Sequence, residues 1–128
     1  MKTATFDDIP GTYVFTGDRA IAGRHLNRFC MSLMSPANRA RFKADERAYV
    51  DEWPMTEAQK QAVLARDFAA LLELGGNIFF VLKIAAVDGR TTQSVAASLA
   101  GQSPQDFAAM MRSGGRSPEG MRSVSGRY

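Results

Sequence analysis

The sequence predicts an all-α protein with one compact domain, and three observations support this prediction. Apolar residues recur at steps of three and four over most of the chain, which is the period of amphipathic helices. Serine, threonine or asparagine precedes most of these runs, and glycine pairs follow several of them, as at helix starts and ends. No segment shows the regular alternation of apolar and polar residues that indicates a half-buried strand. A chain of 128 residues is long enough for a single domain, residues 1–128, with a modest core.

Residues 1–16 are expected to form an extended leader, because Pro10-Gly11 is a turn signal and the stretch is too short for a sheet of its own. Its apolar side chains are expected to pack on the body of the domain: Phe6, Ile9, Tyr13, Val14 and Phe15. The first of about six helices is expected over residues 18–34. One apolar stripe at helical spacing defines its buried face: Ala22, Leu26, Phe29 and Leu33.

The second helix is expected to begin at Ser35-Pro36 and to continue to Trp53. A serine hydroxyl caps a helix, and proline fits the first helical position because its missing N–H would have had no partner there. Phe42, Tyr49 and Trp53 are the expected core residues of this helix. The charged run over residues 45–49 is interpreted as a solvated face.

The third helix begins with a capping box, in which the Thr56 hydroxyl accepts from the third helical N–H and the Gln59 side chain reaches back. Its apolar side is formed by five residues: Val63, Leu64, Phe68, Leu71 and Leu72. Gly75-Gly76 is expected to end this helix, since glycine tolerates the left-handed closing conformation.

Asn77 is expected to cap the fourth helix, residues 78–87, with the sequence IFFVLKIAAV. This helix is apolar on almost every side and is therefore expected to lie at the centre of the domain. Asp88-Gly89 predicts a turn. Thr91 or Thr92 can cap the fifth helix, which ends at residue 99.

The sixth helix is expected to begin at Ser103-Pro104 and to end at Gly114-Gly115. Its inward-facing residues are expected to be Phe107, Met110 and Met111. Residues 114–128, GGRSPEGMRSVSGRY, have no apolar period and are expected to form an irregular C-terminal arm. An arm of this composition is either a loose terminus or a segment that lies on another protein.

The sequence pI of 9.4 would fit a nucleic-acid-binding protein, but the distribution of charge argues against that function. Residues 1–113 contain 13 Lys/Arg and 12 Asp/Glu, and residues 114–128 add three Arg and one Glu. The body is therefore almost neutral, and no helix is expected to carry a one-sided basic stripe. Neither a long apolar span nor a signal-peptide pattern is recognised, so a cytoplasmic location is expected.

A metal site built by this chain alone is not expected, because the sequence contains one histidine and one cysteine. Iron and zinc sites usually draw on two or three histidines or on several cysteines. His25 is interpreted as a surface or partly packed residue, and Cys30 as a buried, inert thiol. No nucleophile–base pair or strained G-x-S-x-G elbow is recognised either. The residues alone thus predict a subunit or interaction module, with no catalytic residue and no cofactor in this chain.

Five blocks in the same order resemble the small (alpha) subunit of protocatechuate 4,5-dioxygenase, a type II extradiol ring-cleavage dioxygenase. The blocks are FDDIPGTYVF, NRFCMSLM, RFKADERAYVDEW, LELGGNIFFVLK and GGRSPEGMRSVSGRY. The resemblance covers nearly the whole chain, from residue 6 to residue 128. It implies a helical, non-catalytic subunit of an enzyme that opens an aromatic ring beside two hydroxyl groups with O2.

The resemblance also implies a partner. In such enzymes a large (beta) catalytic subunit holds Fe(II) and binds the catechol, the small subunit covers the mouth of that site as a lid, and the assembly commonly contains two of each chain. The turn at Arg90-Thr91-Thr92 departs from relatives that place a bulky aromatic side chain near the substrate entrance. Thr91 and Thr92 are therefore candidate lid residues, in addition to their capping role.

The arm gains an interpretation from the same resemblance. Arg116 and Arg122 are candidate partner-binding residues that form charge-assisted hydrogen bonds with the large subunit. The alternative is a stand-alone helical binding or regulatory module of the same fold, without a dioxygenase partner. The catechol that is used, whether protocatechuate, gallate or a relative, is left open by the sequence.

Overall fold

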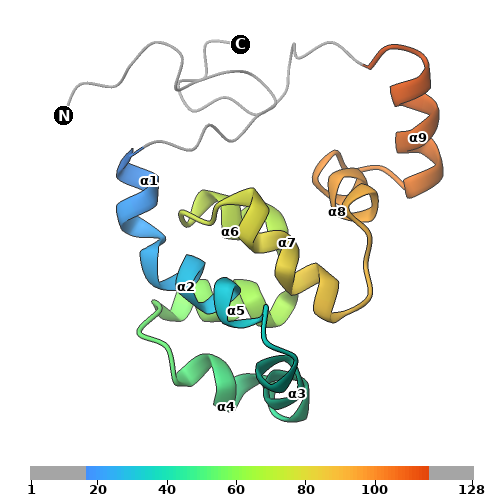
Figure 1. Cartoon of the computed structure of the whole chain (residues 1–128). Coiled ribbons are helices and arrows are strands. Elements are labelled where there is room, and N and C mark those ends of the chain that lie inside the picture. The colour runs from blue at the N-terminus through green and yellow to red at the C-terminus, as the bar shows by residue number, and fades with distance from the viewer. Residues whose placement is uncertain (1–16, 116–128) are drawn as a thin grey trace.

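The computed structural model describes residues 17–115, and this part of the chain is built from helices without a strand (Figure 1). The all-α fold class is therefore confirmed. Nine helices occur in the described range: α1 (Gly17–Ala22), α2 (Arg24–Ser32), α3 (Pro36–Ala44), α4 (Glu46–Asp51), α5 (Glu57–Ala65), α6 (Phe68–Glu73), α7 (Ile78–Val87), α8 (Thr92–Leu99) and α9 (Pro104–Arg112). The predicted packing of the leader, residues 1–16, lies outside the described residues.

The expectation of about six helices is wrong, because each of the three long helices is broken into two. Gly23 separates α1 from α2. Asp45, with extended backbone, separates α3 from α4, and its carboxylate accepts a hydrogen bond from the N–H of Ala48 at 3.1 Å. Arg66 separates α5 from α6 and has a left-handed backbone with a φ of 55°. At Gly23 the chain only bends, because its N–H still donates to the carbonyl of Arg19 and its own carbonyl accepts from the N–H of Asn27.

The predicted helix caps are confirmed wherever they lie in the described range. Ser35 caps α3, with Pro36 at the first helical position. Thr56 and Gln59 form both bonds of the capping box at the start of α5. Asn77 caps α7 and Ser103 caps α9. These side chains satisfy backbone N–H groups that a helix end otherwise leaves unpaired.

The core lies between α2, α5, α6 and α7, and it extends into an aromatic cluster near α3 and α4. Phe29 contacts Phe42 edge-on with ring centroids 5.6 Å apart, and the rings of Tyr49 and Trp53 complete the cluster. Phe29, Phe42 and Tyr49 are buried, and Trp53 packs against them as a half-buried residue. The expected core residues of the second helix are therefore confirmed.

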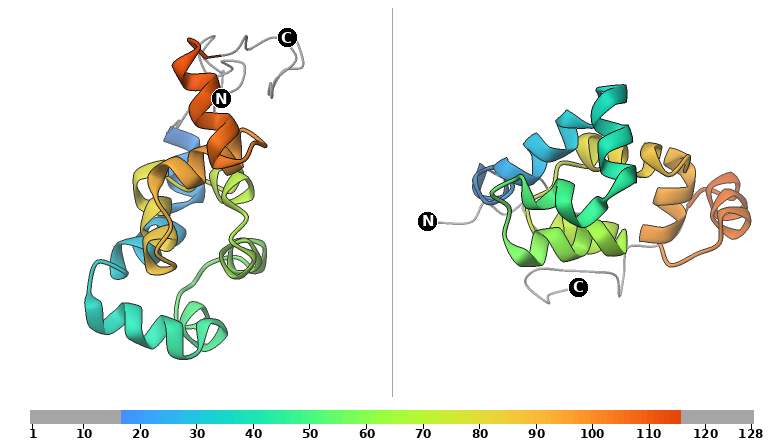
Figure 2. Two further views of the ribbon diagram at one scale, coloured as in Figure 1. Left: turned by 90° about the vertical axis from the view of Figure 1, so that its right-hand side faces the viewer. Right: turned by 90° about the horizontal axis from the view of Figure 1, so that it is seen from below.

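The helices form two sides around this core. The left panel of Figure 2 shows α2 and α7 on one side and α5 and α6 on the other. Helices α3 and α4 pack against each other at one end, while α8 and α9 project at the opposite end (Figure 1). Within residues 17–115, no helix combines the length and apolar character that crossing a bilayer requires.

The turn between α6 and α7 is held by two buried polar side chains. Asn27 donates from Nδ2 to the carbonyl of Gly75 at 3.2 Å and accepts from the N–H of Asn77 at 2.9 Å. Gln59 donates from Nε2 to the carbonyls of Ala22 at 3.1 Å and of Leu74 at 3.0 Å. The ends of α1, α5 and α6 are therefore joined at one point of the fold.

One expectation about burial is wrong, and another needs a qualification. Met111 was expected to face inward, but its side chain is 57% exposed, and α9 has no buried residue because it contacts mainly α8. Phe107 and Met110 are half-buried. Helix α7 contacts α2, α6 and α8, but nothing in the described chain covers Phe79, which is 74% exposed. Helix α7 thus packs among three other helices, as expected of a central helix, but the described residues leave one of its sides uncovered.

Candidate functional site

The turn between α7 and α8 contains both threonines that the sequence singled out. Thr91 is the helix cap, since its hydroxyl accepts from the N–H of Ser94 at 3.0 Å. Thr92 is the first residue of α8, and its side chain is exposed without a hydrogen bond to another described residue. The structure therefore assigns capping to Thr91 and leaves the Thr92 side chain available at the surface.

Arg90 holds this turn against the domain. Its guanidinium lies over the ring of Phe68, with the central carbon 5.0 Å from the ring centroid. The Nε and Nη2 atoms of Arg90 each donate to the hydroxyl of Ser94 at 3.1 Å. A cation over an aromatic face is stabilising when it is partly removed from water. The start of α8 is thereby fixed on α6.

The base of the turn is held by Arg66. Its Nε donates to Asp88 at 2.6 Å, and its two terminal nitrogens donate to Glu46 at 2.9 and 2.8 Å. Lys43 lies 3.4 Å from Asp88, and the Arg66 guanidinium lies over the ring of Phe42 at 5.1 Å. One arginine thus ties α4, the α5–α6 break and the end of α7 together, directly before the turn that carries Thr91 and Thr92.

We expect Arg66→Ala to lower the free energy of unfolding by about 2 kcal/mol. Removing one partner of a fully buried ion pair costs roughly 3–5 kcal/mol, but the Arg66 side chain is 17% exposed, so water partly solvates the carboxylates that remain. Urea unfolding followed by circular dichroism measures the loss. Arg41→Ala is the matched control, because Arg41 also binds a carboxylate and lies 5.1 Å from an aromatic centroid, yet its side chain is 55% exposed. Its loss should be much smaller, and equal losses would contradict the assignment.

The contribution of Arg66 should depend on pH. Hydrogen bonding from Arg66 holds the pKa of Asp88 below its ordinary value of 3.8. Because the folded pKa is lowered, the stabilisation is fully present above about pH 4 and is lost as the pH falls through the folded value. The stability difference between the natural protein and Arg66→Ala should therefore shrink below pH 4. Glu57, whose pKa Arg47 lowers to about 2, does not contribute to this difference, because its partner is unchanged in Arg66→Ala.

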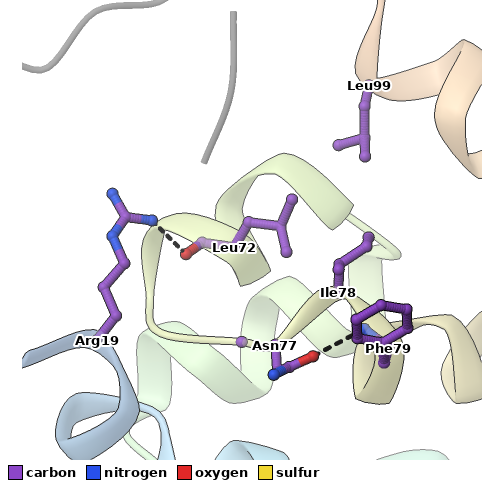
Figure 3. A pocket seen from close by; sticks show the side chains of 7 residues that line it. Arg19, Leu72, Asn77, Ile78, Phe79 and Leu99 are labelled. Atoms are coloured by element: carbon purple, nitrogen blue, oxygen red, sulfur yellow. Dashed lines mark hydrogen bonds between the residues drawn. The ribbon is translucent and has the colours of Figure 1, made fainter. Parts of the chain in front are cut away.

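A hollow of about 300 Å³ lies between α1, α6, α7 and α8. Figure 3 shows Leu72, Ile78 and Leu99 directing their side chains into the same space, with Phe79 at its edge. Arg19 also lines the hollow, where its Nη1 donates to the carbonyl of Leu72 at 2.8 Å and its Nη2 lies 3.6 Å from Glu73. The hollow is therefore a mainly apolar crevice at a helix junction, and the guanidinium that lines it is already paired within the protein.

The side chains of the described residues do not fit a metal centre. No group of three or more histidine, cysteine, aspartate or glutamate residues comes together in residues 17–115. His25 lies on α2, where its Nε2 accepts from Arg24 at 3.3 Å. Cys30 is buried, and burial raises the pKa of its thiol to about 12, so it stays protonated rather than acting as a thiolate. The expectation of a buried, inert thiol is confirmed.

The two arginines that the sequence singled out in the arm, Arg116 and Arg122, lie outside the described residues. Their role as partner-binding residues therefore stays a prediction. Arg66 and Arg90, which hold the turn, were missed by the sequence analysis. The signal for Arg90 was its position directly before the capping threonine, whereas no local signal distinguishes Arg66 from other surface arginines.

Comparison with known proteins identifies the family. Residues 26–112 match the family described as "Aromatic-ring-opening dioxygenase LigAB, LigA subunit". The chain belongs to this family. The matched range begins in α2 and ends with α9, so it includes the turn with Thr91 and Thr92.

A relative from Pseudomonas putida (strain KT2440) supports membership of the LigA family. Its gallate dioxygenase is 34% identical to this chain over 107 residues, which are 83% of this chain and 31% of the relative. The chain thus spans about a third of the length of that protein. In the relative, the LigA-like region forms part of a much longer polypeptide.

Proposed function

We propose that this chain is the non-catalytic small subunit of a type II extradiol dioxygenase, similar to protocatechuate 4,5-dioxygenase. It covers the Fe(II) site of a large catalytic subunit during O2-dependent meta-cleavage of a catecholic acid. The observation that carries the proposal is the family match over residues 26–112, whose description names one subunit of an aromatic-ring-opening dioxygenase. The assembly is proposed to contain two of each chain.

The side chains of this protein support a covering role rather than a chemical one. The described residues provide no ligand cluster for iron, and the only thiol is buried and protonated. We therefore assign no reaction step to this chain. A lid excludes water, which strengthens the electrostatic interactions inside the covered site, and it shapes the pocket that distinguishes one ring substituent from another. The turn with Thr91 and Thr92 suits this role because Arg66 and Arg90 fix it from both ends.

Reconstitution tests the proposal. The large subunit from the same organism, loaded with Fe(II), should form a complex with this chain and convert a catecholic acid to a yellow ring-opened semialdehyde. This chain alone should bind no stoichiometric iron and consume no oxygen with the same compound. The stand-alone module is the correct alternative if the two subunits do not associate and the ring-opening activity of the large subunit is the same with and without this chain.

The Thr92 position and the P. putida relative support a proposal about the substrate. The P. putida relative is a gallate dioxygenase, and Thr92 is small, polar and exposed. We propose a roomy, polar lid that accepts gallate or a related substituted catechol as well as protocatechuate. An additional hydroxyl on the ring can then remain hydrated or hydrogen-bonded instead of meeting an aromatic side chain.

Replacing Thr92 with Phe should change substrate preference. We expect kcat/KM for gallate to fall several-fold relative to protocatechuate, because a bulky aromatic ring fills space that the third hydroxyl needs. The panel should contain catechols that differ at one ring position, assayed on the reconstituted complex. Thr91→Ser is the matched control, since it keeps the hydroxyl that caps α8. If relative kcat/KM values stay constant in Thr92→Phe, Thr92 has no lid role.

The arm is proposed to lie on the large subunit, with Arg116 and Arg122 donating to its carboxylates or carbonyls. Residues 114–128 carry a net charge of +2, from three Arg and one Glu, which favours an acidic surface. Deleting residues 116–128 should weaken co-purification with the large subunit while leaving helices α1 to α9 intact. A truncated chain that forms a fully active complex would show that the arm is dispensable.

A further inference from the structure

Helix α7 exposes apolar surface that no other part of residues 17–115 covers. Nine of its ten residues are apolar, and Lys83 is the exception. Val81, Ile84 and Ala85 face the core, but Phe79 stands on the opposite side and is 74% exposed. Helices that are apolar all round are normally enclosed on all sides. The uncovered side of α7 therefore indicates a surface that another protein encloses.

Helix α2 extends this surface. It packs against α7 on the same side of the domain, as both views show (Figures 1 and 2). Arg24, Arg28 and Met31 share the exposed face of α2, because they are four and three residues apart, and all three are exposed. On α7, Phe79 is exposed and Lys83 is half-buried. We call these residues of the two adjacent helices, Arg24, Arg28, Met31, Phe79 and Lys83, the α2–α7 face.

The α2–α7 face is basic, and its charges have no acidic counterpart nearby on either helix. Neither α2 (RHLNRFCMS) nor α7 (IFFVLKIAAV) contains an acidic residue. Arg28 and Lys83 form no ion pair with another described residue, whereas Arg41, Arg47 and Arg66 elsewhere each bind a carboxylate. A basic face was not expected from the sequence because its cations come from two separate helices.

The positive charge of the α2–α7 face distinguishes between a second copy of this chain and a different protein as its binding partner. In a symmetric pair of identical chains the same patch meets itself, so Arg24, Arg28 and Lys83 would face their own copies, and like charges at an interface are unfavourable. A different protein that has carboxylates around an apolar socket can both cover the Phe79 side chain and pair with the cations. The large catalytic subunit is such a protein if the proposed function holds, because the family description names LigA as one subunit of LigAB. The matched region is 31% of the P. putida relative, so more than two thirds of that polypeptide lies outside the match.

We propose that the α2–α7 face docks on the large catalytic subunit, with Phe79 inserted into an apolar socket that acidic residues surround. This inference rests on the proposed function. Exposed aromatic side chains that become fully desolvated typically carry much of the affinity of an interface. The flanking cations of the α2–α7 face accelerate association and fix its orientation. The α2–α7 face shares no residue with the Thr91–Thr92 turn, so separate variants test docking and covering.

The affinity of the full-length chain for the Fe(II)-loaded large subunit, measured by isothermal titration calorimetry, tests the docking proposal. Phe79→Ser and Lys83→Glu should each weaken binding about tenfold or more. Binding of the natural chain should weaken between 50 and 500 mM salt, and Lys83→Glu should reduce that dependence. The thermal midpoint of Phe79→Ser should stay near that of the natural chain, because Phe79 is already exposed to water. The midpoint of Lys83→Glu, at a half-buried position, is measured alongside so that a loss of folding is not mistaken for a loss of binding.

Ala58→Glu is the control, since it adds a carboxylate to an exposed position of α5 on the opposite side of the domain. It should bind as the natural chain does. Hydrogen exchange in the complex should show new protection over residues 24–34 and 78–87.

The docking proposal is overturned if the natural chain binds but the two α2–α7 variants bind equally well. It is also overturned if residues 1–16 of the chain itself, or a second copy, protect these helices. If the natural chain does not bind at all, the proposed function fails instead.

Discussion

Gly23→Ala is expected to lower the free energy of unfolding by about 3 kcal/mol or more, enough to leave a marginal domain unfolded. A Cβ atom at residue 23 would lie 2.0 Å from the carbonyl oxygen of Gly75 and 2.4 Å from its carbonyl carbon. Both are backbone atoms, so no side-chain rotation relieves the overlap. The α1–α2 junction and the α6–α7 turn would have to separate, and the hydrogen bonds that cross between them would break.

Gly75→Ala should be similarly harmful, for two reasons. The backbone of Gly75 has a φ of +101°, which side chains rarely tolerate, and its Cβ would lie 2.6 Å from the carbonyl oxygen of Arg19. Gly17→Ala is the matched control, because nothing lies within 4 Å of a Cβ at that position of α1. Its stability should be unchanged or raised by about 0.5–1 kcal/mol. Urea unfolding of the three variants tests this, and equal midpoints for Gly23→Ala and the natural chain would contradict the close approach.

The sequence predicted the features of the fold that depend on neighbours in the chain. Thr56 and Gln59 form their capping box from residues three apart, and Asn77 caps α7 through an N–H two residues away. Such bonds are encoded locally, so their pattern is visible before any tertiary contact is known. The all-α class follows from the same local signals.

The helix breaks were not predictable in the same way, because their causes lie far along the chain. Gly23 is an isolated glycine in a helical pattern, which is usually tolerated, and its close approach to Gly75 becomes visible only in the folded chain. Arg66 adopts a left-handed backbone, which costs roughly 1–2 kcal/mol for a non-glycine residue, and its bonds to Glu46 and Asp88 offset that cost. The charged run over residues 45–49 was interpreted as a solvated face, yet Glu46 takes part in this structural ion pair.

In the candidate site, too, local features could be predicted from the sequence, and features formed by distant residues could not. The α7–α8 turn was predicted from Asp88-Gly89, but the sequence could not say whether Thr91 or Thr92 caps α8, since either hydroxyl is correctly placed for one register of the helix. The α2–α7 face needs the packing of two helices and was invisible in either helix alone. Surfaces shared by separate elements thus require the fold, whereas turns and caps do not.

Gln59→Leu is expected to lower the free energy of unfolding by about 3 kcal/mol. Gln59 is 3% exposed, and its amide serves three backbone groups at once: the N–H of Thr56 and the carbonyls of Ala22 and Leu74. Leucine has a similar volume and fills the space, but it leaves these groups without a partner inside the protein. Each buried polar group that loses its hydrogen bond costs roughly 1–3 kcal/mol. Gln61→Leu, two residues further on α5 and exposed, is the control and should have little effect.

Gln59→Glu separates the hydrogen bonds of Gln59 from its volume, because the two side chains have nearly the same shape. The carboxylate can still accept from Thr56, but its second oxygen would face two carbonyl oxygens at about the distance where Nε2 now donates, 3.0 and 3.1 Å. Burial and these carbonyls favour the protonated acid, so the pKa of the new glutamate should rise above its ordinary value. The variant should therefore regain stability as the pH falls from 7 toward 5, a trend opposite in sign to the carboxylate of Asp88. Denaturation midpoints measured at intervals over this range test the donor role: because Gln59→Glu keeps the volume, a variant as stable as the natural chain at pH 7 would show that Gln59 acts through its volume and not as a donor.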